Sequence, residues 1–339
     1  MIRPFGLNDV WLMRRLQRSG VPMAIEHMLT HPRDPLWTAL TAPWPWAGKG
    51  VATFVLSQEG TGHRLSGFVQ LMERAARPEA DLLYLAPAPS QETPPDTTAG
   101  TIWSQLLNYC SFAAANHGLQ RIFASFPDGV PGQDCLKDVG FSLYTRETIY
   151  RLAPPVVGNS QPGFRLQGPG DGWALQRLYA RCTPHLVQQA EGATSGMVGS
   201  PSFPWWEPDS WQGSVWAPAG EMRGAVQVHM GRAGHWMRLL GSTGLAVREQ
   251  RTLIEQGLHL ITNERTQKTR HPLPVYVTVR DYDMGLSSAL SGFGFAPYLD
   301  RTRFVRHTTV PVRESVLTSR PVVEARQEAP ARSQSQWCK

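Results

Sequence analysis

The sequence predicts an α/β protein, an α+β mixed sheet packed with helices, made of two similar tandem units. The main observation is a repeat: CLKDVGFSLYTRETIYRL, at Cys135–Leu152, returns as ALSGFGFAPYLDRTRFVRH at Ala289–His307. Four pairs keep one constant offset between the copies: Gly140 with Gly294, Phe141 with Phe295, Tyr144 with Tyr298, and Thr148 with Thr302. Internal similarity of this kind indicates duplicated structural units. The length agrees, because 339 residues suit two domains of about 150 residues better than one.

Composition narrows the class of protein. Hydrophobic residues make up 41% of the chain and charged residues 18%, so each half can bury a core. The formal charge of +6 is compatible with an anionic ligand and does not demand a nucleic-acid partner, so none is expected. The four cysteines are widely spaced, with no histidine at metal-ligand spacing, so neither a disulfide framework nor a metal site is expected. Without a signal-type N-terminus or a long apolar run, we expect no membrane association and a cytoplasmic location.

The first unit begins with a short strand, Ile2–Phe5, followed by a helix that Asn8 or Asp9 can cap and that runs to Arg18. Alternating apolar residues then predict several strands and one long helix, which Gly118 ends as a C-cap. These elements are the strands Val51–Ser57, Leu65–Arg74 and Asp81–Ala86, the helix Ile102–His117, and the strand Leu119–Phe126.

The second unit restarts in the same way. Phe164–Leu166 is a strand and Asp171 caps the next helix, with Asp9, Trp11 and Arg15 matching Asp171, Trp173 and Arg177 at one offset. The later elements are the strands Val215–Trp216, Arg223–Met230 and Trp236–Leu240, the helix Glu249–Arg265, and the strand Val275–Val279. Each unit then ends in a short helix, a Gly-Phe pair and a final pair of strands.

This pattern sets the predicted domain boundaries. The N-terminal domain covers residues 1–153, a linker rich in Pro, Gly, Asn and Ser covers 154–162, and the C-terminal domain covers 163–310. Residues 311–339 are polar with little periodicity, so we expect a disordered tail.

Two loops rich in proline and tryptophan, here called the Pro-Trp loops, lie at His31–Gly50 and Gly192–Gly220. Exposed tryptophan is costly unless it covers something, so one interpretation is an apolar wall for a substrate. The other is that these side chains plug the end of a small core or the junction between the halves.

The order of elements in each half, ending in helix-Gly-Phe-strand, resembles the GNAT acetyltransferase superfamily over nearly the whole chain except the tail. The resemblance implies a mixed sheet splayed between its fourth and fifth strands. It also implies that the pantetheine arm of acetyl-CoA or another acyl-CoA lies in the gap, with its pyrophosphate at the start of the following helix, where unpaired N–H groups and the helix dipole favour anions.

The family marks that place with a Gln/Arg-x-x-Gly-x-Gly/Ala loop, which neither half has. In the first half the segment Pro87–Thr101 holds four prolines and one glycine. The second half has Gly241–Glu249, a more plausible phosphate cradle, although the segment could equally be an ordinary turn and helix cap. We therefore predict that the second half binds the cofactor, through Leu239, Leu240, Gly241, Ser242, Thr243, Gly244 and Arg248.

Catalytic residues are harder to assign. Family members often have a tyrosine just upstream of the Gly-Phe pair that protonates the leaving thiolate, but Leu136 and Leu290 stand there in this chain. Amine acylation also calls for a base. The candidate catalytic residues are Tyr144 and Tyr298, which follow the Gly-Phe pairs, Glu73 of the first half, and His229 of the second half.

The resemblance implies acyl-CoA-dependent transfer of an acetyl group to an unknown amine, on a small molecule or a peptide. The alternative is a catalytically inactive GNAT-fold scaffold that binds a ligand or partner through its Pro-Trp loops. A third reading is transfer from aminoacyl-tRNA, but the chain has no concentrated basic stripe. The oligomeric state is left open.

Overall fold

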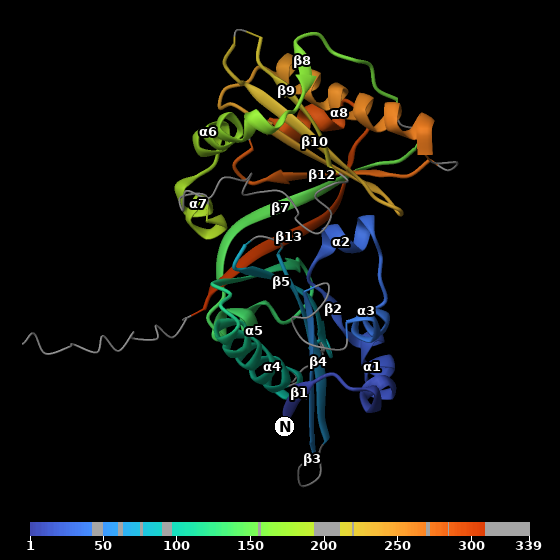
Figure 1. The fold of residues 1–339 in the computed structure, drawn as a ribbon, viewed down its shortest axis with the longest axis vertical. Helices are drawn as coiled ribbons and strands as arrows, with labels where there is room; N and C mark the ends of the chain where they lie inside the picture. The colour runs from blue at the N-terminus through green and yellow to red at the C-terminus, as the bar shows by residue number, and fades with distance from the viewer. Residues whose placement is uncertain are drawn as a thin grey trace, which may run out of the picture.

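A computed structural model of the chain describes residues 1–42, 50–59, 64–74, 77–89, 97–154, 157–192, 211–218, 220–268, 272–283 and 285–308. The strands join in one 13-stranded sheet with the order β1-β3-β4-β5-β6-β13-β7-β12-β11-β10-β9-β8, and β2 pairs with β5 off this path. The first half of the chain, blue to teal in Figure 1, lies below the second half, green to orange. β7 and β13 cross the middle of the molecule between them.

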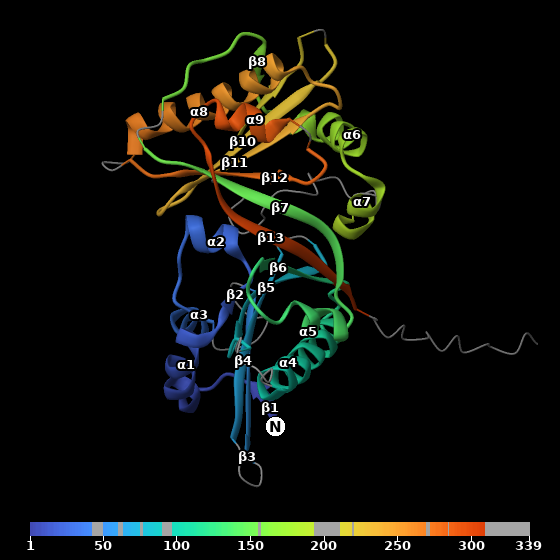
Figure 2. The same ribbon diagram turned by 180° about the vertical axis from the view of Figure 1, so that it is seen from behind.

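The first half contains seven strands and five helices among its described residues. The strands are β1 (Ile2–Pro4), β2 (Val21–Pro22), β3 (Val51–Glu59), β4 (Arg64–Glu73), β5 (Glu79–Ala86), β6 (Arg121–Pro127) and β7 (Ser142–Leu152). The helices are α1 (Val10–Leu16), α2 (Ile25–Thr30), α3 (Pro35–Thr41), α4 (Thr97–Asn116) and α5 (Gln133–Asp138). Figure 2 shows α4 and α5 on one face of this half's sheet and α1 and α3 on the other.

The second half repeats the order with fewer helices between its first strands, as far as the described residues go. The strands are β8 (Phe164–Leu166), β9 (Trp211–Trp216), β10 (Gly224–Met230), β11 (His235–Gly241), β12 (Val275–Arg280) and β13 (Ala296–His307). The helices are α6 (Gly172–Cys182), α7 (His185–Glu191), α8 (Val247–Lys268) and α9 (Leu286–Ser291).

Matching contacts at matching positions confirm the duplication. Asp9 accepts hydrogen bonds from Arg3 and from a backbone N–H three residues before it, at 2.6 and 2.9 Å, and Asp171 does the same with Arg165 at 2.5 Å and its own upstream N–H at 2.8 Å. The glycines of the two Gly-Phe pairs also share a positive φ, +88° at Gly140 and +83° at Gly294. A left-handed backbone at these turns favours glycine and explains why both copies keep it.

The sheet is splayed at the same place in both halves, as the family resemblance implies. β5 and β6 run parallel, but their register ends at Asp81 opposite Phe123. β11 and β12 likewise run parallel only as far as Met237 opposite Val277. The strands continue beyond these points without pairing to each other, so each half has a gap between its fourth and fifth strands.

The prediction that each half ends in a pair of strands is wrong. Each half ends in one long strand, and the two pair with each other across the molecule. β7 also pairs with β12 of the second half, and β13 pairs with β6 of the first. Alternating apolar residues specify a strand but not its partner, so the sequence pattern could not reveal this exchange. As a result the two halves share one continuous sheet.

Each half buries its own core between the sheet and a long helix. The first core packs α4 residues such as Trp103 and Leu106 against Phe126 of β6. The second packs Ile254 and Ile261 of α8 against β-strand residues such as Met237. None of the helices within the described ranges is long and apolar enough to cross a membrane.

Two of the predicted irregular regions are only partly described. The first Pro-Trp loop contains a helix, α3, which Asp34 caps through hydrogen bonds from the N–H groups of Leu36 and Trp37 at 2.8 and 3.1 Å. Its residues 43–49 lie outside the described ranges, as do 193–210 of the second Pro-Trp loop and the predicted tail. In the predicted linker, Gln161 is anchored by its N–H to the side chain of Gln256 at 3.0 Å.

Candidate functional site

The splay of the second half opens into two adjoining cavities. Counting the space open to solvent at their mouths, the inner cavity measures about 700 Å³ and the outer one about 830 Å³. They share five lining residues, Cys182, Leu239, Gly241, Tyr282 and Asp283. The two cavities therefore lie side by side along the unpaired edge of β11, and the inner one reaches the junction between the halves. The two together are here called the channel.

The outer cavity is lined by the turn that connects β11 to α8. Ser242, Thr243 and Gly244 line it together with Gly241, and apolar side chains from α8 and α9 complete the wall. Gly244 has a φ of +82°, and nothing lies within 4 Å of the place where its Cβ would be. The structure thus brings six of the predicted cofactor residues together, Leu239 to Gly244, since Leu240 lines the inner cavity. Arg248 lies apart from both linings, exposed on the first turn of α8.

The start of α8 already carries an anionic cap. Glu249 accepts a hydrogen bond from the N–H of Ala246 at 2.8 Å, and its carboxylate pairs with Arg223 at 2.7 Å. A carboxylate at a helix N-terminus satisfies the free N–H groups and the helix dipole in the same way as a phosphate would. A ligand phosphate would therefore compete with Glu249 for this end of α8.

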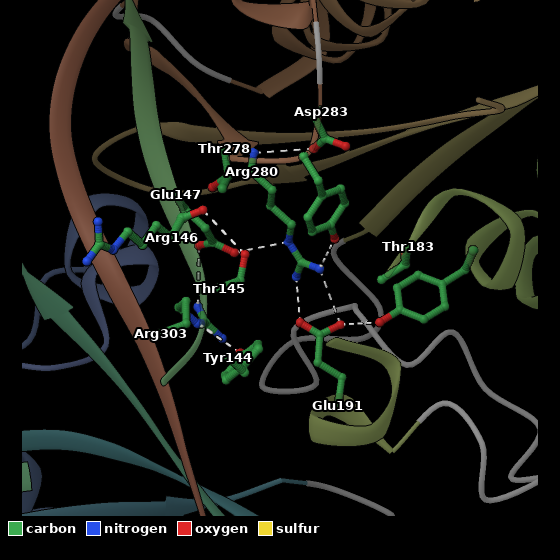
Figure 3. Close-up of polar contacts among 12 residues, drawn as sticks. Tyr144, Thr145, Arg146, Glu147, Thr183, Glu191, Thr278, Arg280, Asp283 and Arg303 are labelled. Carbon is green, nitrogen blue, oxygen red and sulfur yellow. Dashed lines mark hydrogen bonds and ion pairs between the residues drawn. The ribbon is translucent and has the colours of Figure 1, made fainter. Parts of the chain in front are cut away.

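A network of buried charges forms the far end of the inner cavity (Figure 3). Glu147 of β7 lies opposite Arg280 of β12 on one side and Arg301 of β13 on the other, so both pairs are cross-strand neighbours. Its carboxylate accepts hydrogen bonds from Arg280 at 3.1 Å and from Arg301 at 2.8 Å. Arg280 also binds Glu191 of α7 at 2.6 Å, and Glu191 accepts a hydrogen bond from Tyr179. The three strands and α7 are thus joined by ion pairs shielded from water.

The first half contributes a second carboxylate to this network besides Glu147 of β7. Glu26, on α2, lines the inner cavity and pairs with Arg301 at 2.6 Å and Arg303 at 3.5 Å. Burial alone would raise the pKa of Glu26, but Arg301, Arg303 and Arg238 outweigh it and lower the pKa to about 2. Burial opposes ionisation of Glu147 too, and Arg301, Arg303 and Arg280 lower its pKa to about 2. Both carboxylates are therefore ionised at neutral pH.

Two titratable groups stand where the inner and outer cavities meet. Tyr282 follows β12, and its hydroxyl accepts a hydrogen bond from Arg280 at 2.7 Å. Burial raises the pKa of Tyr282, against the opposing charge of Arg280, so the phenol keeps its proton. Burial also raises the pKa of Asp283, whose carboxylate caps the N–H of Arg280 at 3.3 Å. A phenol that holds its proton and a carboxyl group with a raised pKa suit acid and base roles respectively.

Sequence reasoning missed Tyr282 as a site residue. It searched for the proton donor just upstream of the Gly-Phe pair at Gly294. The signal that could have found it is its position directly after the predicted fifth strand, at the open end of the splay. Cys182 also lines both cavities, but burial raises its pKa to about 11, so it is a neutral thiol rather than a nucleophile at neutral pH.

The equivalent gap in the first half is filled by the chain itself. β2 pairs antiparallel with the free edge of β5, Val21 opposite Leu85 and Pro22 opposite Tyr84. The next residue, Met23, donates its N–H to the carbonyl of Leu83 at 2.8 Å and accepts from the N–H of Ser125 on β6 at 3.0 Å. Met23 is 1% exposed and bridges the two splayed strands. An extended cofactor arm has no space left in this gap.

The four predicted catalytic residues do not lie together, and none lines the inner or outer cavity. Tyr144 is linked to the inner cavity through Arg303, a lining residue that donates a hydrogen bond to its hydroxyl at 3.2 Å. Burial raises the pKa of Tyr144 to about 12. Tyr298 is 48% exposed on β13, where it packs edge-on against Tyr276. His229 is buried beside His31 and Trp211, with ring centroids 5.1 Å away from each. Glu73 lies at the far end of β4, 3.7 Å from His117.

Apart from the final strands, the order of elements and the splay in both halves are those that the family resemblance implies. The chain folds as two tandem GNAT-like units. Each keeps the fourth-to-fifth strand gap, and the exchanged final strands make the units one sheet. No family model and no curated protein matches the sequence.

Several solved structures similar to this chain are described as acetyltransferases or as GNAT proteins. A GCN5-related N-acetyltransferase from Sphaerobacter thermophilus is 12% identical, with a TM-score of 0.48, 91% of this chain covered and 95% of the other. A tandem GNAT protein from the clavulanic acid biosynthesis pathway is also 12% identical, with a TM-score of 0.46 and coverage of 91% and 98%. A putative acetyltransferase from Pyrococcus horikoshii is 10% identical, with a TM-score of 0.45 and coverage of 91% and 90%.

Proposed function

We propose that this protein is an N-acyltransferase of GNAT type that transfers an acetyl group from acetyl-CoA to an amine, at the splay of its second half. One observation carries the proposal. Adjoining cavities lie along β11 from the turn at Ser242–Gly244 to Tyr282 and Asp283, while the equivalent gap of the first half is filled by Met23. Only one half is therefore expected to bind the cofactor.

The residues of the channel suit an extended arm that carries amides and ends in a thioester. Leu239 and Gly241 lie on the part of β11 that no longer pairs with β12, and strand edges bind extended chains through main-chain hydrogen bonds. Because Glu249 occupies the N–H of Ala246, the phosphates are expected beside the hydroxyls of Ser242 and Thr243 and near the exposed Arg248. Acetyl-CoA, when bound, supplies an activated acyl group on sulfur.

Tyr282 and Asp283 are the proposed acid and base. Asp283, with its raised pKa, removes a proton from the attacking ammonium so that the amine nitrogen can form the new C–N bond. As the C–S bond breaks, the hydroxyl of Tyr282 gives its proton to the departing sulfur. Arg280 holds that hydroxyl in place at 2.7 Å. The cavity contributes proximity of the two reactants as its largest expected effect.

A pair of tyrosine variants tests the proposed acid. With acetyl-CoA and a panel of primary amines, release of free CoA is followed through its thiol. Tyr282→Phe is expected to lower kcat by at least about tenfold, with the Kd for acetyl-CoA unchanged. If Tyr298→Phe lowers kcat and Tyr282→Phe does not, the proton donor lies on β13, as one of the sequence-based predictions has it.

The inactive scaffold remains the competing prediction. The carboxylate cap on α8 favours it, since Glu249 weakens the anion site that the family uses. A protein that binds no acetyl-CoA at millimolar concentration would support the scaffold and exclude the proposed enzyme.

A further inference from the structure

We propose that residues 21–31 of the first half form the acceptor-side wall of the reaction cavity in the second half, with Glu26 as the carboxylate that binds the amine of the acceptor. The inference rests on the proposed function, which it extends by assigning a substrate-binding residue to the half that cannot bind cofactor. The segment comprises β2, Met23, α2 and His31.

Residues 21–31 fill the gap of the first half and also contribute to the inner cavity of the second half. Val21, Pro22 and Met23 fill the first splay, bonded to β5 on one side and to β6 on the other. The chain turns at Ala24 and enters α2 immediately. The helix α2 therefore starts beside the filled gap of the first half and extends towards the second half. Figure 1 shows α2 at the junction between the halves, beside the crossing strands β7 and β13.

Contacts along α2 anchor it to the second half. Ile25 is 1% exposed and packs in a cluster with Trp236 and Tyr276 of β11 and β12. At the other end, the carbonyl of Thr30 accepts hydrogen bonds from the N–H groups of Arg232 and Ala233, at 2.9 and 3.0 Å. These contacts fix the helix on either side of Glu26 and leave its side chain directed into the inner cavity.

Glu26 is better suited to binding an amine than to transferring a proton. Arg301 and Arg303 both hold Oε1, and the side chain keeps 13% of its surface exposed to the cavity. An ionised carboxylate only accepts hydrogen bonds, so the group it can bind is a donor such as an ammonium or amine N–H. Asp283 lines the same cavity from the turn after β12. A nitrogen held by Glu26 can therefore pass its proton to Asp283.

This arrangement predicts the class of acceptor. It is a primary amine whose nitrogen reaches the inner cavity from the junction of the halves, opposite the turn at Ser242–Gly244. A compound with a hydroxyl or ether in place of the amine donates fewer hydrogen bonds to Glu26 and is expected to be a poor acceptor.

The test separates binding of the amine from binding of acetyl-CoA. At saturating acetyl-CoA, CoA release is measured with the twenty amino acids, putrescine and tyramine, and the best acceptor is used for all variants. Glu26→Gln is expected to raise the KM for that amine by about tenfold or more, the loss of one hydrogen bond to a charged group. The Kd for acetyl-CoA is expected to stay the same. Glu26→Asp, which keeps the charge, is expected to restore part of the affinity.

Glu79→Gln is the matched control. Glu79 is also a buried carboxylate held by arginines, Arg74 at 3.0 Å, Arg121 at 3.1 Å and Arg77 at 3.9 Å. It lies in the first half and lines neither cavity. Any change in amine KM caused by general loosening should appear in this variant as well, and none is expected.

Three outcomes overturn the inference. An unchanged amine KM in Glu26→Gln, even with a lower melting temperature, would mean that Glu26 only holds the halves together. Equal rises in KM for Glu26→Gln and Glu79→Gln would point to loosening. A wild-type protein that binds no acetyl-CoA, or turns over none of these amines, would remove the proposed function and this inference together.

Discussion

Replacing Arg301 with methionine removes the cation at the centre of the junction while keeping a side chain of similar length. Arg301 is 1% exposed and donates to Glu147 at 2.8 Å and to Glu26 at 2.6 Å. Both partners belong to the first half of the chain, on β7 and α2, so Arg301 of β13 ties the second half to the first. The variant leaves two ionised carboxylates buried with fewer cations. Glu26 keeps its pair with Arg303 at 3.5 Å, and Glu147 keeps Arg280 at 3.1 Å and Arg303 at 4.0 Å.

The expected cost follows from this geometry. Breaking a buried ion pair by removing one partner typically lowers the free energy of unfolding by about 3 to 5 kcal/mol, since an uncompensated charge stays behind. The loss should depend on pH with a definite sign. In the variant the pKa values of Glu26 and Glu147 rise relative to the wild type, because burial opposes their ionisation and one cation is gone. Protonation then relieves the uncompensated charge, so the stability lost by the variant relative to the wild type shrinks as pH falls.

Urea unfolding followed by circular dichroism measures both effects. The free energy of unfolding of Arg301→Met is compared with that of the wild type at pH 7 and pH 5, and the difference is expected to shrink at pH 5. Lys137→Met serves as the control, because Lys137 makes an exposed pair with Asp134 that is expected to contribute under about 1 kcal/mol. A loss below about 1 kcal/mol in Arg301→Met, or one that grows at pH 5, would refute the reasoning.

Other variants test the channel, the core and the acid response. Gly244→Val should weaken acetyl-CoA binding about tenfold in calorimetry, since β-branched residues resist a φ of +82°, while Gly118→Val, at φ +86° and equally open, should not. Trp103→Ala should cost about 3 to 5 kcal/mol in urea unfolding, as Trp103 is fully buried. Wild-type stability should fall as pH drops from about 4.5 towards 2, where Glu26 and Glu147 protonate; a flat profile would contradict their assignment.

The parts of the fold that local pattern decides could be predicted from the sequence. The Gly-Phe turns and the aspartates Asp9 and Asp171 mark the same places in both halves, and the structure shows matching contacts there. Contrary to the prediction, neither aspartate side chain caps the helix that follows it; each accepts a hydrogen bond from the N–H three residues before it instead. Composition misled the prediction at residues 31–50, where α3 forms despite its prolines. The signal was present, because Asp34 followed by Pro35 is a helix start.

The exchange of the final strands and the filled first splay depend on tertiary pairing that no local pattern encodes. β7 and β13 would satisfy the same alternation with either partner, and β2 is too short to be recognised.

The candidate site likewise contains residues that the sequence could locate and residues that it could not. Leu239 to Gly244 follow one another in the chain, so the element order alone located them. Glu26 and Arg301 are 275 residues apart and meet only because α2 crosses to the second half. Chemistry assembled from such distant segments is visible only in the folded protein.

Titration of the full-length protein with acetyl-CoA by calorimetry tests the central claim most directly. One molecule bound per chain is the predicted result, because the second splay is open and Met23 fills the first. Two molecules per chain would mean that the first half also opens to the cofactor. No binding at millimolar concentration would contradict the proposed enzyme.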